Sequence, residues 1–208
     1  MLCVEKKKIN KLIMSKKILF CLLFLFFSTC LGFSQEQKTA KNALKTTFLS
    51  YATGSIKLSY ERLLTTNQSV EITGGVIGVG FDGMNNRPRG GLFRCAHKIN
   101  LSGNEYSFNG LYYKSEFALS SFDYDFMLES TGNKEILRKN STMGALMACL
   151  GYQLGWKFLI FDSYVGIGGS LGSECDTYYE HGFILWDFFN TKNKHIALTF
   201  GMKLGFIF

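Results

Sequence analysis

The C-terminal end of the chain alternates strictly between large apolar residues and small or polar ones. In residues 195–208 (HIALTFGMKLGFIF), every second position is large and apolar, and Lys203 lies on the opposite face. A period of two is that of a β-strand with one apolar face. Strands of soluble proteins usually have about five or six residues, whereas a transmembrane strand needs roughly 9–11. We therefore predict a membrane-spanning strand whose other face lines a barrel lumen.

The same period recurs in seven segments upstream, four of them clear and three weaker. These segments are residues 55–64, 111–122, 146–154, 157–171, 43–52, 69–81 and 91–101. Short and long connections alternate between them, apart from a tight first hairpin at 52–54. Three long connections are expected, at 82–91, 123–141 and 172–194. Outer-membrane barrels show this asymmetry, so the pattern predicts an all-β fold, an eight-stranded antiparallel up-and-down transmembrane β-barrel.

An eight-stranded barrel has an interior just wide enough to be filled by side chains. The polar faces of the predicted strands would place eight charged residues there: Lys57, Glu61, Arg94, Lys98, Lys114, Glu116, Asp162 and Lys203. Buried charges are tolerated when they are paired. We predict a polar network that plugs the lumen, which disfavours a conducting channel.

The first 34 residues are typical of a secretory signal peptide. Six lysines precede the apolar run 18–33, and the small residues Gly32 and Ser34 precede Gln35. An uncleaved helix and a lipid-modified Cys30 are alternatives, but 16 apolar residues fall short of the about 20 of a helical span. Cleavage would leave residues 35–208 as one outer-membrane barrel domain, whether translation starts at Met1 or at Met14.

Removing the leader changes the charge of the chain. The whole chain carries 23 Lys and Arg against 16 Asp and Glu, a formal charge of +7. The leader holds six of these bases and one acid, so 17 bases and 15 acids remain, a net charge of +2. No arginine-rich or nucleic-acid-binding motif remains, so nucleic acid is not an expected partner.

Three cysteines remain in the predicted mature chain, Cys95, Cys149 and Cys175. Their number is odd and their spacings match no zinc pattern. Free or packed thiols and a single disulfide both stay open.

The segment from Leu58 to Arg62 (LSYER), reached by the predicted tight hairpin, resembles the start of small outer-membrane β-barrel proteins of Bacteroidota, among them a family of unknown function. The leader end, Phe33-Ser34-Gln35, is similar to signal peptides of that phylum. The resemblance implies an OmpA/OmpX-like eight-stranded barrel in the outer membrane of a Gram-negative bacterium, with no established catalytic residues. The terminal strand is similar to the sequence that the barrel-assembly machinery recognises. Its signal residues would be Phe200, Met202, Leu204, Phe206 and Phe208.

No residue pattern in the chain defines a catalytic, cofactor-binding or metal site. The three histidines, His97, His181 and His195, stand in no local arrangement with a serine, although a catalytic triad is recognised by geometry and not by spacing. We expect no enzyme activity and no cofactor. The alternative is a membrane-embedded lipid-modifying enzyme resembling a lipid A deacylase or acyltransferase, which would need such residues to converge on the lipid-facing wall.

We expect a structural or loop-mediated interaction role in the outer membrane. Its partners would be membrane lipid, the barrel-assembly machinery during biogenesis, and an external partner bound through the loops 123–141 and 172–194. The second alternative is a secreted soluble barrel that binds a small ligand. That protein would need its apolar faces inside and its polar faces outside. The sequence identifies neither the ligand nor the oligomeric state.

Overall fold

The computed structural model describes residues 40–81, 86–102, 108–130, 133–173, 181–186 and 194–208. These residues belong to one compact unit, Gln37–Phe208. The predicted signal peptide and Cys175 lie outside the described residues.

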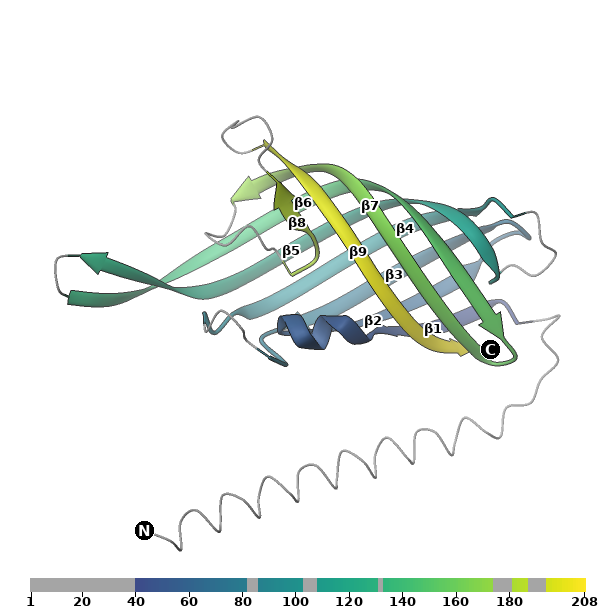
Figure 1. Ribbon diagram of the computed structural model, residues 1–208, viewed down its shortest axis with the longest axis horizontal. Coiled ribbons are helices and arrows are strands. Elements are labelled where there is room, and N and C mark those ends of the chain that lie inside the picture. Colours follow the sequence, from purple (N-terminus) through teal and green to yellow (C-terminus); the bar gives the residue numbers. More distant parts are fainter. Residues whose placement is uncertain (1–39, 82–85, 103–107, 131–132, 174–180, 187–193) are drawn as a thin grey trace, which may run out of the picture. The chain divides into compact units, whose positions relative to one another are not determined.

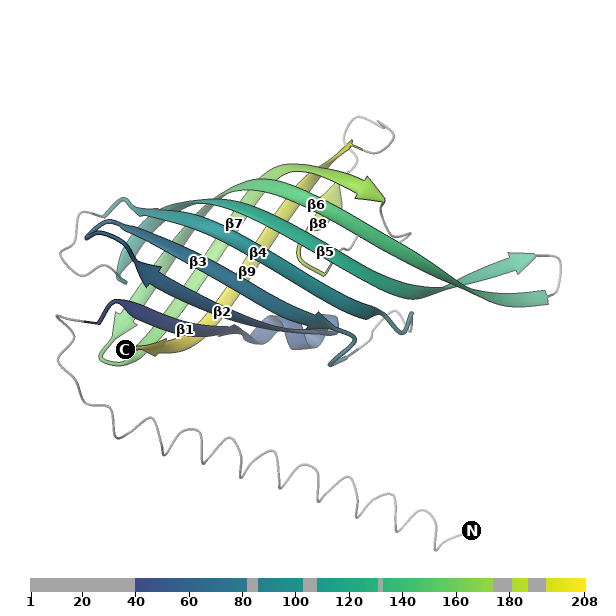
Figure 2. The same ribbon diagram turned by 180° about the vertical axis from the view of Figure 1, so that it is seen from behind.

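Eight long strands of the described chain close into an antiparallel barrel (Figures 1 and 2). They are β1 (Asn42–Thr47), β2 (Ser55–Leu63), β3 (Gln68–Ile77), β4 (Arg89–Asn100), β5 (Gly110–Ser130), β6 (Asn133–Trp156), β7 (Leu159–Ser173) and β9 (Lys194–Ile207). Each pairs with the next, and β1 pairs with β9 from Ala43↔Ile207 to Thr47↔Lys203. This last pairing joins the two end strands of the sheet and closes the barrel. The predicted eight-stranded antiparallel β-barrel is confirmed as a fold.

The side chains alternate between the lumen and the outer wall along every strand, as a period of two requires. On β6, Leu146, Leu150 and Leu154 are 69%, 54% and 50% exposed, whereas the intervening Cys149 and Gln153 are 1% and 4% exposed. The barrel is therefore apolar outside and largely polar inside.

The prediction of a strand over 43–52 that ends in a tight hairpin at 52–54 is wrong beyond Thr47. The strand β1 stops at Thr47, and the chain turns into the 3-10 helix η1 (Phe48–Thr53). Hydroxyl groups hold this turn: Ser50 Oγ donates to the Thr47 carbonyl at 2.5 Å, and Thr53 Oγ1 donates to the Ser50 carbonyl at 3.0 Å. Gly54 then takes a left-handed conformation (φ 74°), which a residue without Cβ adopts at little cost, and leads into β2.

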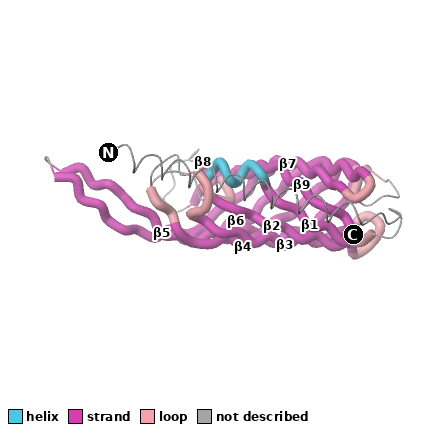
Figure 3. The backbone as a smooth tube through the Cα atoms, turned by 90° about the horizontal axis from the view of Figure 1, so that it is seen from below, coloured by secondary structure: helices cyan, strands magenta, loops and turns pink. Residues whose placement is uncertain are grey.

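The predicted loop 123–141 is also corrected. Both strands of the β5–β6 pair continue through it, from Asp123↔Asn140 to Ser130↔Asn133. The extended hairpin projects beyond the rest of the barrel (Figures 1 and 3). An antiparallel pair can continue through polar residues because its backbone hydrogen bonds do not depend on the side chains.

The connection 172–194 contains a short strand, β8 (Ile184–Trp186), which pairs with β9 at Ile196–Leu198. It lies against the part of β9 that β1 does not reach (Figure 1). Among the described residues, no helix has the length and hydropathy to cross a membrane.

The opposite end of the barrel holds the chain end Phe208 and the turn between β6 and β7. Trp156 pairs with Leu159, and Leu159 pairs with Phe206 on β9. The rings of Phe158 and Phe206 stack with centroids 6.2 Å apart. This end therefore has an aromatic rim.

Candidate functional site: the polar interior

All eight residues of the predicted interior network lie in the barrel interior and are buried. The most exposed of them, Lys57, is 7% exposed, and Lys114 and Asp162 are fully buried. The structure joins seven of them by hydrogen bonds and ion pairs into two clusters. Lys57 joins neither cluster.

The first cluster takes one side chain from every strand that closes the barrel, and we call it the girdle. Its members, in strand order from β1 to β9, are Lys45, Glu61, Glu71, Lys98, Tyr112, Gln153, Asp162 and Lys203. Three ammonium groups face three carboxylates, so its formal charge is zero. Four of its members (Lys45, Glu71, Tyr112 and Gln153) were not predicted from the sequence.

Two lysines occupy the centre of the girdle. Lys98 Nζ donates to Glu61 at 3.0 Å and to Glu71 and Asp162 at 2.9 Å. Lys45 Nζ binds the same three carboxylates, with the bond to Asp162 at 2.7 Å. Each lysine thus uses its three donors on three different strands, β2, β3 and β7.

The remaining members of the girdle give the carboxylates further partners, and Ser69 Oγ donates to the second oxygen of Glu61 at 2.5 Å. The Tyr112 hydroxyl donates to Asp162 Oδ1 at 2.5 Å, and Gln153 Nε2 donates to Glu61 at 2.9 Å and Asp162 at 3.2 Å. Lys203 binds the second oxygen of Glu71. A buried ion pair is tolerable when further hydrogen bonds satisfy its remaining atoms, and this condition is met here.

The three girdle carboxylates lie close enough to share a cation, with ligand oxygens within 4.8 Å of one another. However, the ammonium groups of Lys45 and Lys98 already contact all three. A metal ion would have to displace two positive charges, so this donor set does not fit a metal site.

The second cluster lies on the side of the girdle toward the β5–β6 hairpin. Glu116 pairs with Arg94 and, at 2.6 Å, with Lys114. Arg94 also donates to the Tyr164 hydroxyl at 2.9 Å and to Thr199 Oγ1 at 2.8 Å. Lys114 Nζ lies 3.6 Å from the centre of the Tyr164 ring, a cation–π contact. This cluster joins strands β4, β5, β7 and β9.

The enzyme alternative requires a serine and a histidine on the lipid-facing wall. Ser170 and His195 are paired across β7 and β9, but both are buried, on the faces of these strands that turn toward the lumen. The Ser170 hydroxyl donates to the backbone carbonyl of His195 at 3.3 Å. A serine nucleophile needs a hydrogen bond to the imidazole ring of its base. The bond from Ser170 goes to the backbone of His195 and not to its ring. His97 faces outward and contacts Gln68 at 3.3 Å.

The five residues of the predicted assembly signal lie on one face of the terminal segment. Phe200, Met202, Leu204 and Phe208 are exposed, and Phe206 is half-buried against Phe158. Their placement fits an outer wall, and their recognition by assembly machinery stays a prediction. Cys95 and Cys149 are both free thiols.

No family model and no curated protein sequence matches this chain. Among solved structures, the chain is similar to the N-terminal β-barrel domain of Pseudomonas aeruginosa OprF. The two are 12% identical, with 81% of this chain and 98% of that domain covered and a TM-score of 0.39.

Proposed function

We propose that the protein is an integral β-barrel of the outer membrane of a Gram-negative bacterium, delivered there by a cleaved signal peptide. Its role is structural or depends on its projecting segments, and its lumen does not conduct. The single observation that carries this proposal is the inverted barrel: an exposed apolar wall around a buried charged interior. The Leu58–Arg62 pattern and the leader end support an origin in Bacteroidota.

The height of the apolar wall suits a membrane. On β9, every outward position from Ile196 to Phe208 is apolar. Twelve residue steps span about 40 Å along a strand and about 30 Å along the axis of a barrel with strands tilted by about 40°. The apolar band of outer-membrane barrels is about 25 Å tall, between aromatic girdles. The wall of this barrel is therefore tall enough to cross the hydrocarbon core.

The soluble alternative requires the reverse arrangement, with apolar faces inside. The lumen instead holds ten buried charged residues, six cations and four anions, among the described part of the chain. A water-facing wall of leucine and phenylalanine would expose an apolar surface far larger than soluble monomers carry.

The girdle supports a closed lumen. Each strand of the barrel sends one polar side chain into a connected network, and its lysines and carboxylates are at most 3% exposed on their side chains. An ion crossing the barrel would have to break several charge-assisted hydrogen bonds at once.

The projecting β5–β6 hairpin supports an interaction role. Met127 and Ile136 are 56% and 58% exposed there, beside the ion pair of Asp125 and Arg138. An apolar and charged surface held away from the barrel is suited to contact a partner outside the membrane. This hairpin takes the place of the expected loop 123–141. No catalytic role forms part of the proposal.

Membrane fractionation with a gel comparison of unheated and boiled samples tests the location. We expect the protein in the outer-membrane fraction, with a mobility that shifts on boiling because a closed barrel resists detergent until it is heated. A protein in the soluble fraction would overturn the proposal. For the closed lumen, we expect no steady conductance in a planar bilayer, and regular single-channel steps would contradict it.

A further inference from the structure

The barrel wall has a gap between β9 and β2. β1 pairs with β9 only up to Thr47↔Lys203, and β8 covers β9 only at Ile196–Leu198. In the described part of the chain, residues 199–202 of β9 have no strand partner on this side. The helix η1 and the segment 182–184 lie at the gap without forming a ladder across it.

A cavity of about 70 Å³ lies at this gap. On the outer side it is lined by Leu49 and Phe200, which are exposed on the apolar wall, and on the inner side by the buried Lys57 and Thr199. One water needs about 10–15 Å³ by the same measure, so the cavity has room for several waters or for a small oxyanion. It therefore connects the apolar wall to the charged interior.

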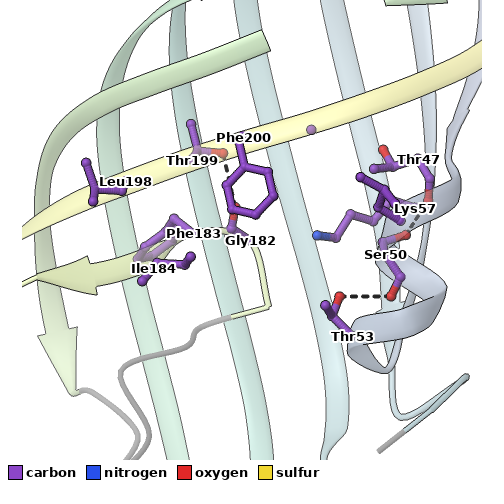
Figure 4. Close-up of a pocket in the computed structure, with 12 residues that line it drawn as sticks. Thr47, Ser50, Thr53, Lys57, Gly182, Phe183, Ile184, Leu198, Thr199 and Phe200 are labelled. Atoms are coloured by element: carbon purple, nitrogen blue, oxygen red, sulfur yellow. Dashed lines mark hydrogen bonds between the residues drawn. The ribbon is translucent and has the colours of Figure 1, made fainter. Parts of the chain in front are cut away.

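Lys57 extends from β2 into this cavity and is 93% buried (Figure 4). The other buried cations of the described chain, Lys45, Arg94, Lys98, Lys114 and Lys203, all form ion pairs. The Lys57 ammonium group has no hydrogen-bond or ion-pair partner among the described residues. A buried ammonium group without a partner is costly, so its position calls for an anion.

The charges around Lys57 also favour a bound anion. The girdle is neutral, so the excess of two buried cations lies with Lys57 and the second cluster, where Arg94, Lys114 and Lys57 face Glu116 alone. Arg94 and Lys203 repel Lys57, and Glu116 attracts it. An oxyanion bound at Lys57 would reduce this local excess.

The cavity also offers a second polar atom. Thr47 Oγ1 is buried and has no hydrogen-bond partner in the described part of the chain. Thr47 lines the cavity together with Lys57 (Figure 4). A hydroxyl and an ammonium group are both donors to an oxyanion, so two buried groups would be satisfied by one ligand.

We propose that this wall cavity binds the oxyanion head group, carboxylate or phosphate, of a single-chain amphiphile whose alkyl chain lies on the outer wall beside Leu49 and Phe200. The Lys57 ammonium and the Thr47 hydroxyl hold the head group. The oxyanion site rests on the cavity alone. The membrane as the source of the ligand rests on the proposed outer-membrane location.

The test uses the full mature chain refolded in micelles of dodecyl maltoside, a neutral detergent, with folding checked by the heat-dependent gel shift. Titration calorimetry measures binding of dodecyl phosphate, decanoate and inorganic phosphate. We expect both amphiphiles to bind with one site per chain, at least about tenfold more tightly than inorganic phosphate. Equal binding of dodecyl phosphate and inorganic phosphate would overturn the amphiphile as the ligand.

The variant Lys57→Met keeps the length of the side chain and removes the charge. We expect it to weaken dodecyl phosphate binding about tenfold or more, because the head group loses a charge-assisted hydrogen bond. Lys157→Met, in the exposed turn between β6 and β7, makes the same change in net charge and should leave binding unchanged. Equal binding by wild type and both variants would overturn the site.

Thr47→Val provides a second variant if Lys57→Met does not fold. It removes only the hydroxyl and should weaken binding several-fold, and unchanged binding would count against the assigned donor set. The binding measurements test the cavity independently of where the protein is located. Binding by a chain that fractionates as soluble would refute the proposed function alone, whereas a membrane barrel without binding would refute this inference alone.

Discussion

Replacing Asp162 by Asn tests how strongly the girdle stabilises the barrel. Its carboxylate accepts hydrogen bonds from Lys45, Lys98, Gln153 and Tyr112, and it is fully buried. The substitution keeps the shape of the side chain but removes one of the three negative charges of the girdle. The girdle then carries a net charge of +1 in an interior that water does not reach.

Removing one partner of a buried ion pair costs about 3–5 kcal/mol. Because about 1.4 kcal/mol corresponds to a tenfold change in an equilibrium constant, the ratio of folded to unfolded protein should fall by roughly two to three and a half powers of ten. The assay is urea unfolding of the barrel refolded in lipid vesicles, followed by the fluorescence of Trp156 and Trp186.

A matched control is Asp125→Asn on the projecting hairpin. Asp125 forms a 2.6 Å ion pair with Arg138, and the two side chains are 17% and 43% exposed, against 0% for Asp162. Exposed ion pairs contribute only about 0–1 kcal/mol, so this variant should unfold almost as the wild type does. If Asp162→Asn destabilised the barrel no more than Asp125→Asn does, the girdle would not be a source of stability.

A compensating substitution sharpens the same test. Adding Lys98→Met to Asp162→Asn returns the girdle to two cations and two anions. The double variant should then be less destabilised than the sum of the two single variants, by a coupling energy of about 0.5–3 kcal/mol. Strict additivity of the two substitutions would show that these groups do not interact.

Three further predictions concern the wall, its assembly and the hairpin. Gly168→Ala should lower the unfolding free energy by about 1–3 kcal/mol, because the added Cβ would clash with the Leu146 backbone. Gly169→Ala is the control and should have no such effect, because a Cβ added there has no neighbour within 4 Å. Deleting Phe208 should reduce the heat-modifiable fraction in cells, with Phe81→Ala as control, and normal insertion would refute the assembly signal. Replacing 127–136 by Asn-Gly should change the unfolding free energy by less than about 0.5 kcal/mol, and a larger loss would show that the hairpin supports the barrel.

The alternation of residues was enough to predict the barrel and the interior position of its charges. Glu71 and Lys45 follow the same period, but they lie in the weaker segments and were missed. The pairing of charges was not predictable, because Lys203 and Glu71 meet across 132 residues and Lys45 and Asp162 across 117. Such contacts depend on the register of all the strands between them.

The end of β1 was not predictable for a different reason. Phe48 and Tyr51 favour a strand by their residue type. The chain leaves the wall there because hydroxyl hydrogen bonds of Ser50 and Thr53 compete with the ladder, and Gly54 permits the reversal. The cavity at Lys57 follows from this local departure, so no periodicity could have revealed it.

The central claim is that the apolar outer wall of the barrel faces lipid. It is tested most directly by a nitroxide label at Leu150→Cys, in a variant without the native cysteines, with Ile136→Cys on the hairpin as reference. In lipid vesicles, we predict that collisions with oxygen exceed collisions with a water-soluble nickel complex at position 150, and that the order reverses at position 136. If the label at position 150 collided with the nickel complex as often as the label at position 136 does, the account would be contradicted.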